Sequence, residues 1–452
     1  MRFRGTLVFC FPVLLLAGCS LYSDVSISPL NINPMQIDRG SDLQSMVNKS
    51  DYLRAIEFEP TIEARQRKSV VDLQALGNAE LIAGRYDEAR RHLRAAIDKE
   101  PFRETRAHIE WSLSQLEYLT NNYAASLDWA QAATAHGLTV KQWHQDYLAA
   151  LSGVQIYRAS GLASSQIAMR YSRPDVPRIE VRLNGHKTVS AVIDTGAVTS
   201  IASQRLADEL SLRTLPGVRG TFYGLLGEPI PVEFALLDSV TVGDIVVENV
   251  PIAIMPDDKM QFVVNGRREF KLDFLLGANF LKEFRTDLDF ARSVVTFKRL
   301  TPADRHPAPN QNLFIQSFRP FVRGTMNGHG WYVFVLDTGS EITFLNEKQI
   351  MNLPISQIAP RVHSALLQGL GGSQKRGGRI DDVEIGIDRW AGTFRSVPMY
   401  SSGEQENAAG IIGENFLKHF RVIIDYGRMR VDLVRGNSAL VVPPPNALTA
   451  TR

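Results

Sequence analysis

The pattern of apolar and polar positions changes once along the chain, from a helical to a strand-like spacing. Between residues 51 and 165 the apolar positions recur at helical spacing, and glycine and proline are few. From Pro177 onward, short runs alternate apolar and polar side chains and end at turn signals such as Asn184-Gly185. The pattern predicts a helical domain followed by an all-β region.

One segment of the helical region has the spacing of a tetratricopeptide repeat, a pair of antiparallel helices. Its positions are Leu73, Leu76, Gly77, Gly84, Tyr86, Ala89, Leu93, Ala96 and Pro101. A weaker copy contains Leu113, Tyr123, Ser126, Ala130 and Ala133, and its offset of 123 − 86 = 37 residues predicts an extended helix junction. A third helical stretch from Trp143 to Tyr157 is expected to cap the stack. The domain is either a surface for a protein partner or a plain helical spacer.

Two apolar runs in the β region each lead into the tripeptide Asp-Thr-Gly. They read Ala-Val-Ile-Asp-Thr-Gly at 191–196 and Phe-Val-Leu-Asp-Thr-Gly at 334–339, an offset of 337 − 194 = 143 residues. The same offset superposes Asn-Gly-His at 184–186 on Asn-Gly-His at 327–329. A repeat of this length predicts two copies of one structural unit. The two histidines have no second histidine nearby at ligand spacing, so we assign them to the hairpin turns.

A second landmark recurs downstream of each Asp-Thr-Gly. Leu-Leu-Gly-Ala-Asn-Phe-Leu-Lys at 275–282 matches Ile-Ile-Gly-Glu-Asn-Phe-Leu-Lys at 411–418. Asp-Thr-Gly, then a flap hairpin, then two apolar residues and Gly resembles the lobe of an aspartic protease, in the bacterial branch similar to the retroviral enzymes. The resemblance covers roughly residues 170–436 and implies a pepsin/retropepsin-like double lobe.

Hydrolysis of a peptide bond by carboxylates alone needs two of them sharing one proton across a bound water, because charges that close cannot both ionise. We therefore expect Asp194 and Asp337 to form the dyad of an aspartic endopeptidase without a cofactor or metal ion. Which of them holds the proton stays open. The resemblance implies loop support from Thr195, Gly196, Thr338, Gly339 and Ser340, with the threonines cross-bonding the two loops.

The two motifs differ in the residue that follows them. Ser340 follows the second and could hydrogen-bond its carboxylate, whereas Ala197 follows the first and cannot. One donor fewer to the charged form should leave the dyad less acidic, so activity is expected nearer neutral pH than in the gastric enzymes.

Each lobe should carry a flap that closes over an extended peptide or an unstructured protein segment. The candidates are Tyr223 and Gly224 in lobe 1 and Gly369 and Gly371 in lobe 2, although glycine-rich hairpins also occur for structural reasons. Because both lobes lie in one chain, a monomer can complete the site. Pairing of like lobes between chains is the alternative.

Composition and the N-terminal sequence bear on the partners and the cellular location of the protein. The 452 residues are 44% hydrophobic with a net charge of +2 and no long basic run, so nucleic acid is not an expected partner. A short apolar run, Leu7 to Leu16, ends in Leu-Ala-Gly-Cys and reads as a signal peptide. This ending resembles the lipobox of bacterial lipoproteins, which implies a lipidated Cys19 and an anchor on the periplasmic face of a membrane. Ser20 favours the outer membrane.

These inferences divide the chain into seven parts. They are a signal peptide (1–18), a flexible tether (19–50), a tetratricopeptide-like helical domain (51–165), lobe 1 (170–300), an interlobe linker (301–317), lobe 2 (318–436) and a disordered tail (437–452). The alternatives to an enzyme are an inactive peptide-binding protein and a scaffold lipoprotein that acts through its helical domain.

Overall fold

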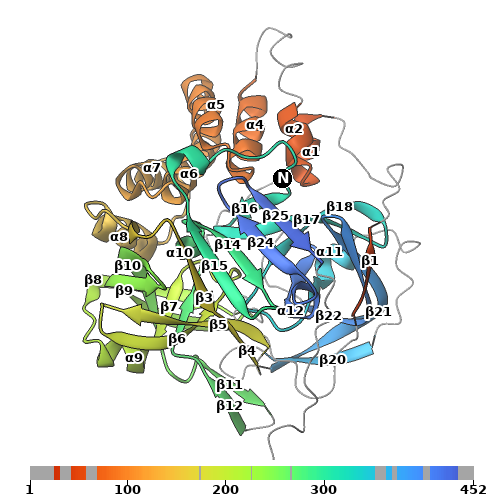
Figure 1. The fold of residues 1–452 in the computed structure, drawn as a ribbon. Coiled ribbons are helices and arrows are strands. Elements are labelled where there is room, and N and C mark those ends of the chain that lie inside the picture. Colours follow the sequence, from red (N-terminus) through yellow and green to blue (C-terminus); the bar gives the residue numbers. More distant parts are fainter. Residues whose placement is uncertain are drawn as a thin grey trace, which may run out of the picture.

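The structure is a computed structural model, in which strand β1 (Val25–Pro29) is followed by a helical region and then by a region made mostly of strands (Figure 1). It describes residues 25–30, 42–57, 69–172, 175–224, 227–264, 267–351, 363–368, 374–400 and 408–435. The predicted order, a helical region followed by a β-rich region, is confirmed. Within the described residues, no helix is long and apolar enough to cross a membrane.

After two short helices, α1 (Leu43–Asn48) and α2 (Tyr52–Glu57), the helical region contains two helix hairpins and a further helix. The hairpins are α4 (Val70–Ile82) with α5 (Tyr86–Lys99) and α6 (Arg103–Leu119) with α7 (Tyr123–Ala135), and α8 (Gln142–Leu151) follows. Ser69 begins α4 with a capping box, because its hydroxyl accepts from the Asp72 N–H at 3.1 Å while the Asp72 carboxylate bonds back to it. A side-chain carbon on Gly77 would lie 2.7 Å from Cγ of Leu93, so glycine permits the close approach of α4 and α5.

The extended junction predicted for the second hairpin is wrong. Three residues separate the helices in both hairpins, 83–85 and 120–122. The extra length lies inside α6, which has 17 residues where α4 has 13. The turn between the helices therefore has the same length in both hairpins, and the first helix of the second hairpin is longer.

The two lobes contain matching nine-stranded sheets. Lobe 1 runs β2-β10-β7-β13-β6-β5-β9-β8 with β4 on β5, and lobe 2 runs β1-β22-β19-β23-β18-β17-β21-β20 with β16 on β17. The strands of lobe 1 are β2 (Arg158–Gly161), β4 (Arg170–Ser172), β5 (Val176–Leu183), β6 (Lys187–Ile193), β7 (Ser200–Ser203), β8 (Thr214–Tyr223), β9 (Pro229–Val242), β10 (Ile245–Met255) and β13 (Phe274–Leu276). Those of lobe 2 are β1 (Val25–Pro29), β16 (Leu313–Gln316), β17 (Arg319–Met326), β18 (His329–Leu336), β19 (Phe344–Asn346), β20 (His363–Gln368), β21 (Gln374–Ile387), β22 (Trp390–Tyr400) and β23 (Gly410–Ile412). The repeat seen in the sequence is thus a repeat of strand order.

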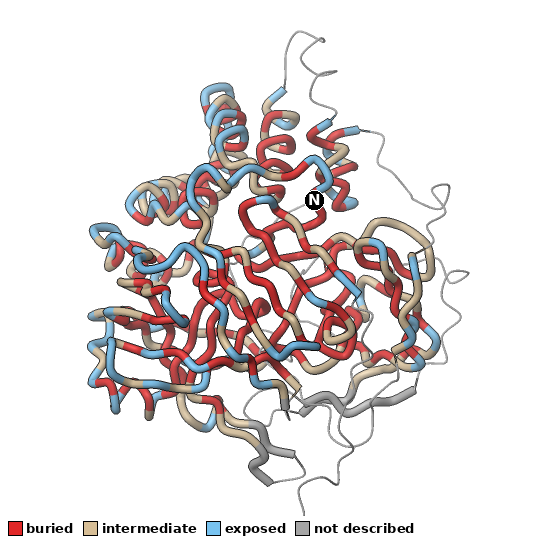
Figure 2. The backbone as a smooth tube through the Cα atoms, in the orientation of Figure 1, coloured by how far each residue is buried: buried red, intermediate tan, exposed pale blue. Residues whose placement is uncertain are grey.

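A five-stranded antiparallel sheet joins the lobes. Its order is β25-β24-β14-β15-β3, from β25 (Arg430–Val434), β24 (Arg421–Asp425), β14 (Phe284–Asp289), β15 (Val294–Arg299) and β3 (Ser164–Ala168). At its centre β14 of lobe 1 pairs with β24 of lobe 2, and Arg421 forms a bidentate ion pair with Asp287 at 2.8 and 2.5 Å. Figure 2 shows buried residues running through the sheets and along the helices, and exposed residues on the outer turns.

Three predicted boundaries are corrected. Residues 25–29 were assigned to the flexible tether but form β1, an edge strand of lobe 2 paired with β22, because Val25 and Ile27 pack on the core. The helical domain ends at α8, so β2 and β3, partly assigned to 51–165, belong to the sheets. β16, assigned to the linker 301–317, pairs with β17. The signal peptide, Cys19 and the tail 437–452 lie outside the described residues.

The helical region packs on both lobes. On lobe 2, α1 (Leu43–Asn48) and α2 (Tyr52–Glu57) share a core with the sheet: the Tyr52 and Phe314 rings lie 5.4 Å apart, and Gln316 donates to the Tyr52 hydroxyl at 2.8 Å. The assignment of 19–50 to a tether is therefore also wrong for α1, whose Leu43 and Met46 are buried.

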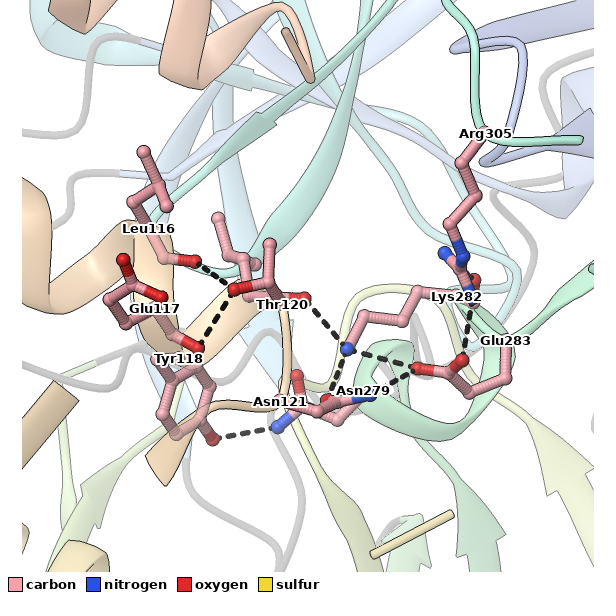
Figure 3. Close-up of polar contacts among 10 residues, drawn as sticks. Leu116, Glu117, Tyr118, Thr120, Asn121, Asn279, Lys282, Glu283 and Arg305 are labelled. Atoms are coloured by element: carbon pink, nitrogen blue, oxygen red, sulfur yellow. Dashed lines mark hydrogen bonds and ion pairs between the residues drawn. The ribbon is translucent and has the colours of Figure 1, made fainter. Parts of the chain in front are cut away.

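On lobe 1, the end of α6 docks on the residues after Leu-Leu-Gly (Figure 3). Asn279 donates to the Tyr118 hydroxyl at 2.7 Å, and the Lys282 ammonium donates to the Leu119 carbonyl at 2.9 Å and to the Asn121 side chain at 2.6 Å. Glu283 pairs with Lys282 at 3.0 Å. These hydrogen bonds and the ion pair join the end of α6 to lobe 1.

Candidate active site

Each Asp-Thr-Gly loop begins where a buried strand ends. β6 delivers the first loop beside its parallel neighbour β13, and β18 delivers the second beside β23. The Asp194 N–H donates to the Leu276 carbonyl at 3.0 Å, and the Asp337 N–H donates to the Ile412 carbonyl at 3.1 Å. The two apolar residues of each second landmark therefore hold the aspartate of the same lobe.

The threonines of the two loops cross-bond the lobes. The Thr195 N–H donates to Oγ1 of Thr338 at 3.2 Å, and the Thr338 N–H donates to Oγ1 of Thr195 at 3.0 Å. Each hydroxyl then donates across the boundary at 2.6 Å, Thr195 to the Leu336 carbonyl and Thr338 to the Ile193 carbonyl. This reciprocal arrangement fixes the position of one loop against the other.

The glycines bring the two carboxyl groups together. A side-chain carbon on Gly196 would overlap the Asp337 carboxylate, and one on Gly339 would overlap the Asp194 carboxylate. Both carboxyls are fully buried. Oδ1 of Asp194 accepts from the Ala197 N–H and Oδ1 of Asp337 from the Gly339 N–H, both at 2.9 Å. Oδ2 of each aspartate accepts no hydrogen bond from the described residues, so both keep an oxygen for chemistry.

Burial dominates the electrostatics of the pair. Burial raises the pKa of Asp194 to about 7, against the lowering effect of the Ala197 N–H. Burial and the neighbouring Asp194 charge raise the pKa of Asp337 well above its usual range, and the buried Arg319 offsets part of the shift in both. A carboxyl whose pKa is raised in this way stays protonated to a higher pH than an ordinary aspartate.

The expected hydrogen bond from Ser340 to the aspartate is absent among the described contacts. The Ser340 hydroxyl donates instead to the Ile342 carbonyl at 2.9 Å. Ser340 is buried, and a buried hydroxyl needs a hydrogen-bond partner, which this carbonyl supplies. The difference between Ser340 and Ala197 therefore does not change the donors to the carboxylates. A raised pKa follows from burial instead.

A third buried carboxyl, Glu414, was missed by the sequence argument. It is fully buried and neither carboxyl oxygen makes a hydrogen bond within the described chain. It begins α12 (Glu414–Leu417), and its N–H donates to the Ser340 carbonyl at 2.8 Å, directly behind the second loop. Burial raises its pKa well above the usual range, and the nearby Asp337 adds to the shift. The signal was present, since Ala278 stands at the matching position of lobe 1.

The flap candidates are placed in part. Tyr223 is half-buried at the end of β8, and the Gly224 N–H donates to the Glu228 carbonyl at 2.9 Å, closing the β8–β9 hairpin. Gly369 and Gly371 lie outside the described residues, between the paired strands β20 and β21. In the described part of the chain, no group of three or more His, Cys, Asp or Glu side chains could hold a metal ion.

Residues 179–280 match the model of a family described as aspartyl protease. Among solved structures, a retropepsin-like aspartic protease from Rickettsia conorii is 18% identical, covers 32% of this chain and 97% of its own, and has a TM-score of 0.23. An aspartic proteinase from Irpex lacteus is 11% identical over 61% of this chain and 98% of its own, at 0.35. Basic 7S globulin from soybean is 10% identical over 62% and 98%, at 0.34. No curated protein matches.

The family match spans the first Asp-Thr-Gly and the first Leu-Leu-Gly, so lobe 1 is similar to an aspartyl protease. Likenesses with TM-scores this low add nothing to what the geometry of the site indicates.

Proposed function

We propose that this chain is an aspartic endopeptidase whose dyad is Asp194 and Asp337. One observation carries the proposal: each carboxyl is buried against the glycine of the other lobe, with one oxygen unused by the described protein. The cross-bonded threonines hold this geometry before substrate arrives, which is how a preorganised site lowers a barrier.

The reaction follows from one shared proton. The ionised carboxylate accepts a proton from a water whose oxygen attacks the peptide carbonyl carbon, while the protonated carboxyl gives its proton to the carbonyl oxygen. The carboxyl that took the water's proton then gives it to the amide nitrogen as the C–N bond breaks, while a diol hydroxyl gives its proton to the other carboxylate as the new carbonyl forms. The products are a carboxylic acid and an amine, and the dyad again holds one proton.

The substrate class is extended peptide or unstructured protein, since a hairpin flap receives a strand-like segment. The chain would act as a monomer with both lobes in the site, and we propose no cofactor. A protein partner of the tetratricopeptide-like region would bind the exposed faces of α5 and α7. Nucleic acid is not part of the proposal.

We further propose a lipid anchor at Cys19 on the periplasmic face of the outer membrane. The body would lie close to that membrane, because β1 begins at Val25 and only residues 20–24 separate the two. Five extended residues reach roughly 18 Å.

The test uses soluble protein starting at Ser20, incubated with an unstructured protein near pH 6. Asp194→Asn and Asp337→Asn should each lower the cleavage rate at least about a thousandfold, because neither can complete the proton exchange. Mixing the two variants should restore nothing if the dyad forms within one chain. Recovery in the mixture would show pairing between chains, and a folded wild type that cleaves nothing from pH 3 to 8 would favour the peptide-binding alternative.

A further inference from the structure

The lobe 1 flap hairpin has a helix packed on one of its faces. The Trp143 ring of α8 stacks on Phe234 of β9, with centroids 5.6 Å apart and planes at 15°, and meets Phe222 of β8 edge-on at 6.5 Å. Tyr147, one turn further along α8, lies 4.9 Å from Phe234. A side-chain carbon on Gly220 would lie 3.3 Å from Cδ2 of Trp143, so glycine leaves room for the indole.

The strand period places the flap tyrosine on the opposite face. Gly220 and Phe222 are two residues apart and share the face that meets α8, so Tyr223 points the other way. Exposure agrees with this alternation, because Phe222 is 1% exposed and Tyr223 only half-buried. The helix therefore covers the back of the hairpin and leaves the Tyr223 face uncovered.

The helix itself is firmly held. His144 of α8 lies 5.8 Å from the Trp111 ring and 6.1 Å from the Tyr118 ring, both on α6. Burial lowers the pKa of His144 to about 4, so it packs as a neutral ring. Tyr118 in turn accepts the hydrogen bond from Asn279, which lies in the second landmark of lobe 1. A continuous chain of contacts thus runs from the framework of the site through α6 and α8 to the flap.

We propose that α8 positions the lobe 1 flap, with Trp143 and Tyr147 as positioning residues of the site. This inference rests on the proposed function for its catalytic consequence. A flap held from behind presents Tyr223 to the substrate without having to order the hairpin first, so less binding energy is lost on closure. The helical region would then act within the chain, as a brace for the flap.

The test removes the Trp143 ring of α8 in the soluble protein that starts at Ser20. Trp143→Ala should speed hydrogen exchange of residues 214–234 about tenfold and raise KM about tenfold, with kcat and the pH–rate profile little changed. Trp143→Phe keeps a ring on Phe234 and should stay near wild type. Trp129→Ala is the matched control, since Trp129 packs on a separate helical cluster, and it should leave flap exchange and KM unaltered.

The outcomes separate the two proposals. The proposal that α8 positions the flap would be overturned if Trp143→Ala left the hydrogen-exchange rate of the β8–β9 hairpin unchanged. It would also be overturned if that rate rose while KM stayed the same. If Trp143→Ala does not fold, Trp143→Leu takes its place, with Trp143→Phe again as the variant that keeps the ring. A flap exchange rate equal to wild type in Trp143→Leu would overturn the proposal that α8 positions the flap. A wild type that cleaves nothing contradicts the proposed function, while exchange in the same samples still decides whether α8 holds the hairpin.

Discussion

The two lobes have the same strand order but differ in what surrounds it. In lobe 1, α8 packs on the flap hairpin β8–β9, whereas the described part of the β20–β21 hairpin in lobe 2 has no comparable helix against it. Behind the loops, Ala278 of lobe 1 is matched by the buried Glu414 of lobe 2. The Asp-Thr-Gly residues are the same in both lobes, and the threonines and glycines of each loop contact the opposite lobe.

The two lobes indicate at which positions a duplicated structural unit can change its residues independently. A contact that crosses the boundary between the lobes must fit two partners at once, so a change on one side needs a change on the other. Ala278 and Glu414 stand at matching positions outside these reciprocal contacts, and there the two lobes differ. The following three predictions test this division.

The largest effect is expected at the symmetric glycines. Gly196→Ala and Gly339→Ala should each lower kcat/KM about a hundredfold or more, and by similar factors, because each new methyl group would displace the carboxyl of the opposite lobe. Gly153→Ala is the control, since its added carbon would meet nothing within 4 Å. A loss confined to one of the two glycine variants would break the symmetry argument.

A smaller, pH-dependent effect is expected at Glu414. Its pKa is raised in the folded protein, so the unfolded state releases the proton first and stability falls as pH rises above the unfolded value of 4.5. Glu414→Gln should therefore raise the free energy of unfolding near pH 7, by about 1.4 kcal/mol for each unit of raised pKa, and change it little near pH 4. Urea unfolding at both pH values measures this. An equal change in the free energy of unfolding at both pH values would show that the titration of Glu414 is not its cause.

The smallest effect is expected at Ser340. Ser340→Ala removes a hydroxyl that donates to the Ile342 carbonyl, so the free energy of unfolding should fall by about 1 kcal/mol. The pH–rate profile should keep its shape, because the hydroxyl does not bond the Asp337 carboxylate. A shift of the acidic limb by about one pH unit would show that Ser340 does tune the dyad.

The sequence predicted the parts of the fold that repeat. Asp194 and Asp337 were predicted as a pair because each lies in a motif that recurs with its context, and the structure brings the two carboxyls together. The order of helices and strands followed from apolar spacing. Glu414 could not be predicted from the repeat, because it stands at a position where the two landmarks differ. The Trp143 contact could not be predicted, since periodicity shows that a helix has an apolar face and not which strand will cover it.

The turn geometry of the helical region was predicted from an offset alone, and that was insufficient. An offset of 37 residues is satisfied equally by a longer turn or a longer helix, and only the structure distinguishes them. The predicted hydrogen bond from Ser340 to the Asp337 carboxylate was wrong for a similar reason. Closeness in sequence did not determine the partner, since the hydroxyl donates to the Ile342 carbonyl.

The pairing of β1 with β22 sets an order in which the chain can complete its sheets. Val25 pairs with Phe394, a separation of 394 − 25 = 369 residues, whereas the corresponding edge pair of lobe 1, Gly161 with Ile245, is separated by 245 − 161 = 84. During synthesis lobe 1 can close its edge while most of lobe 2 is still unmade. The first strand of the chain must wait, unpaired, for one of the last to emerge.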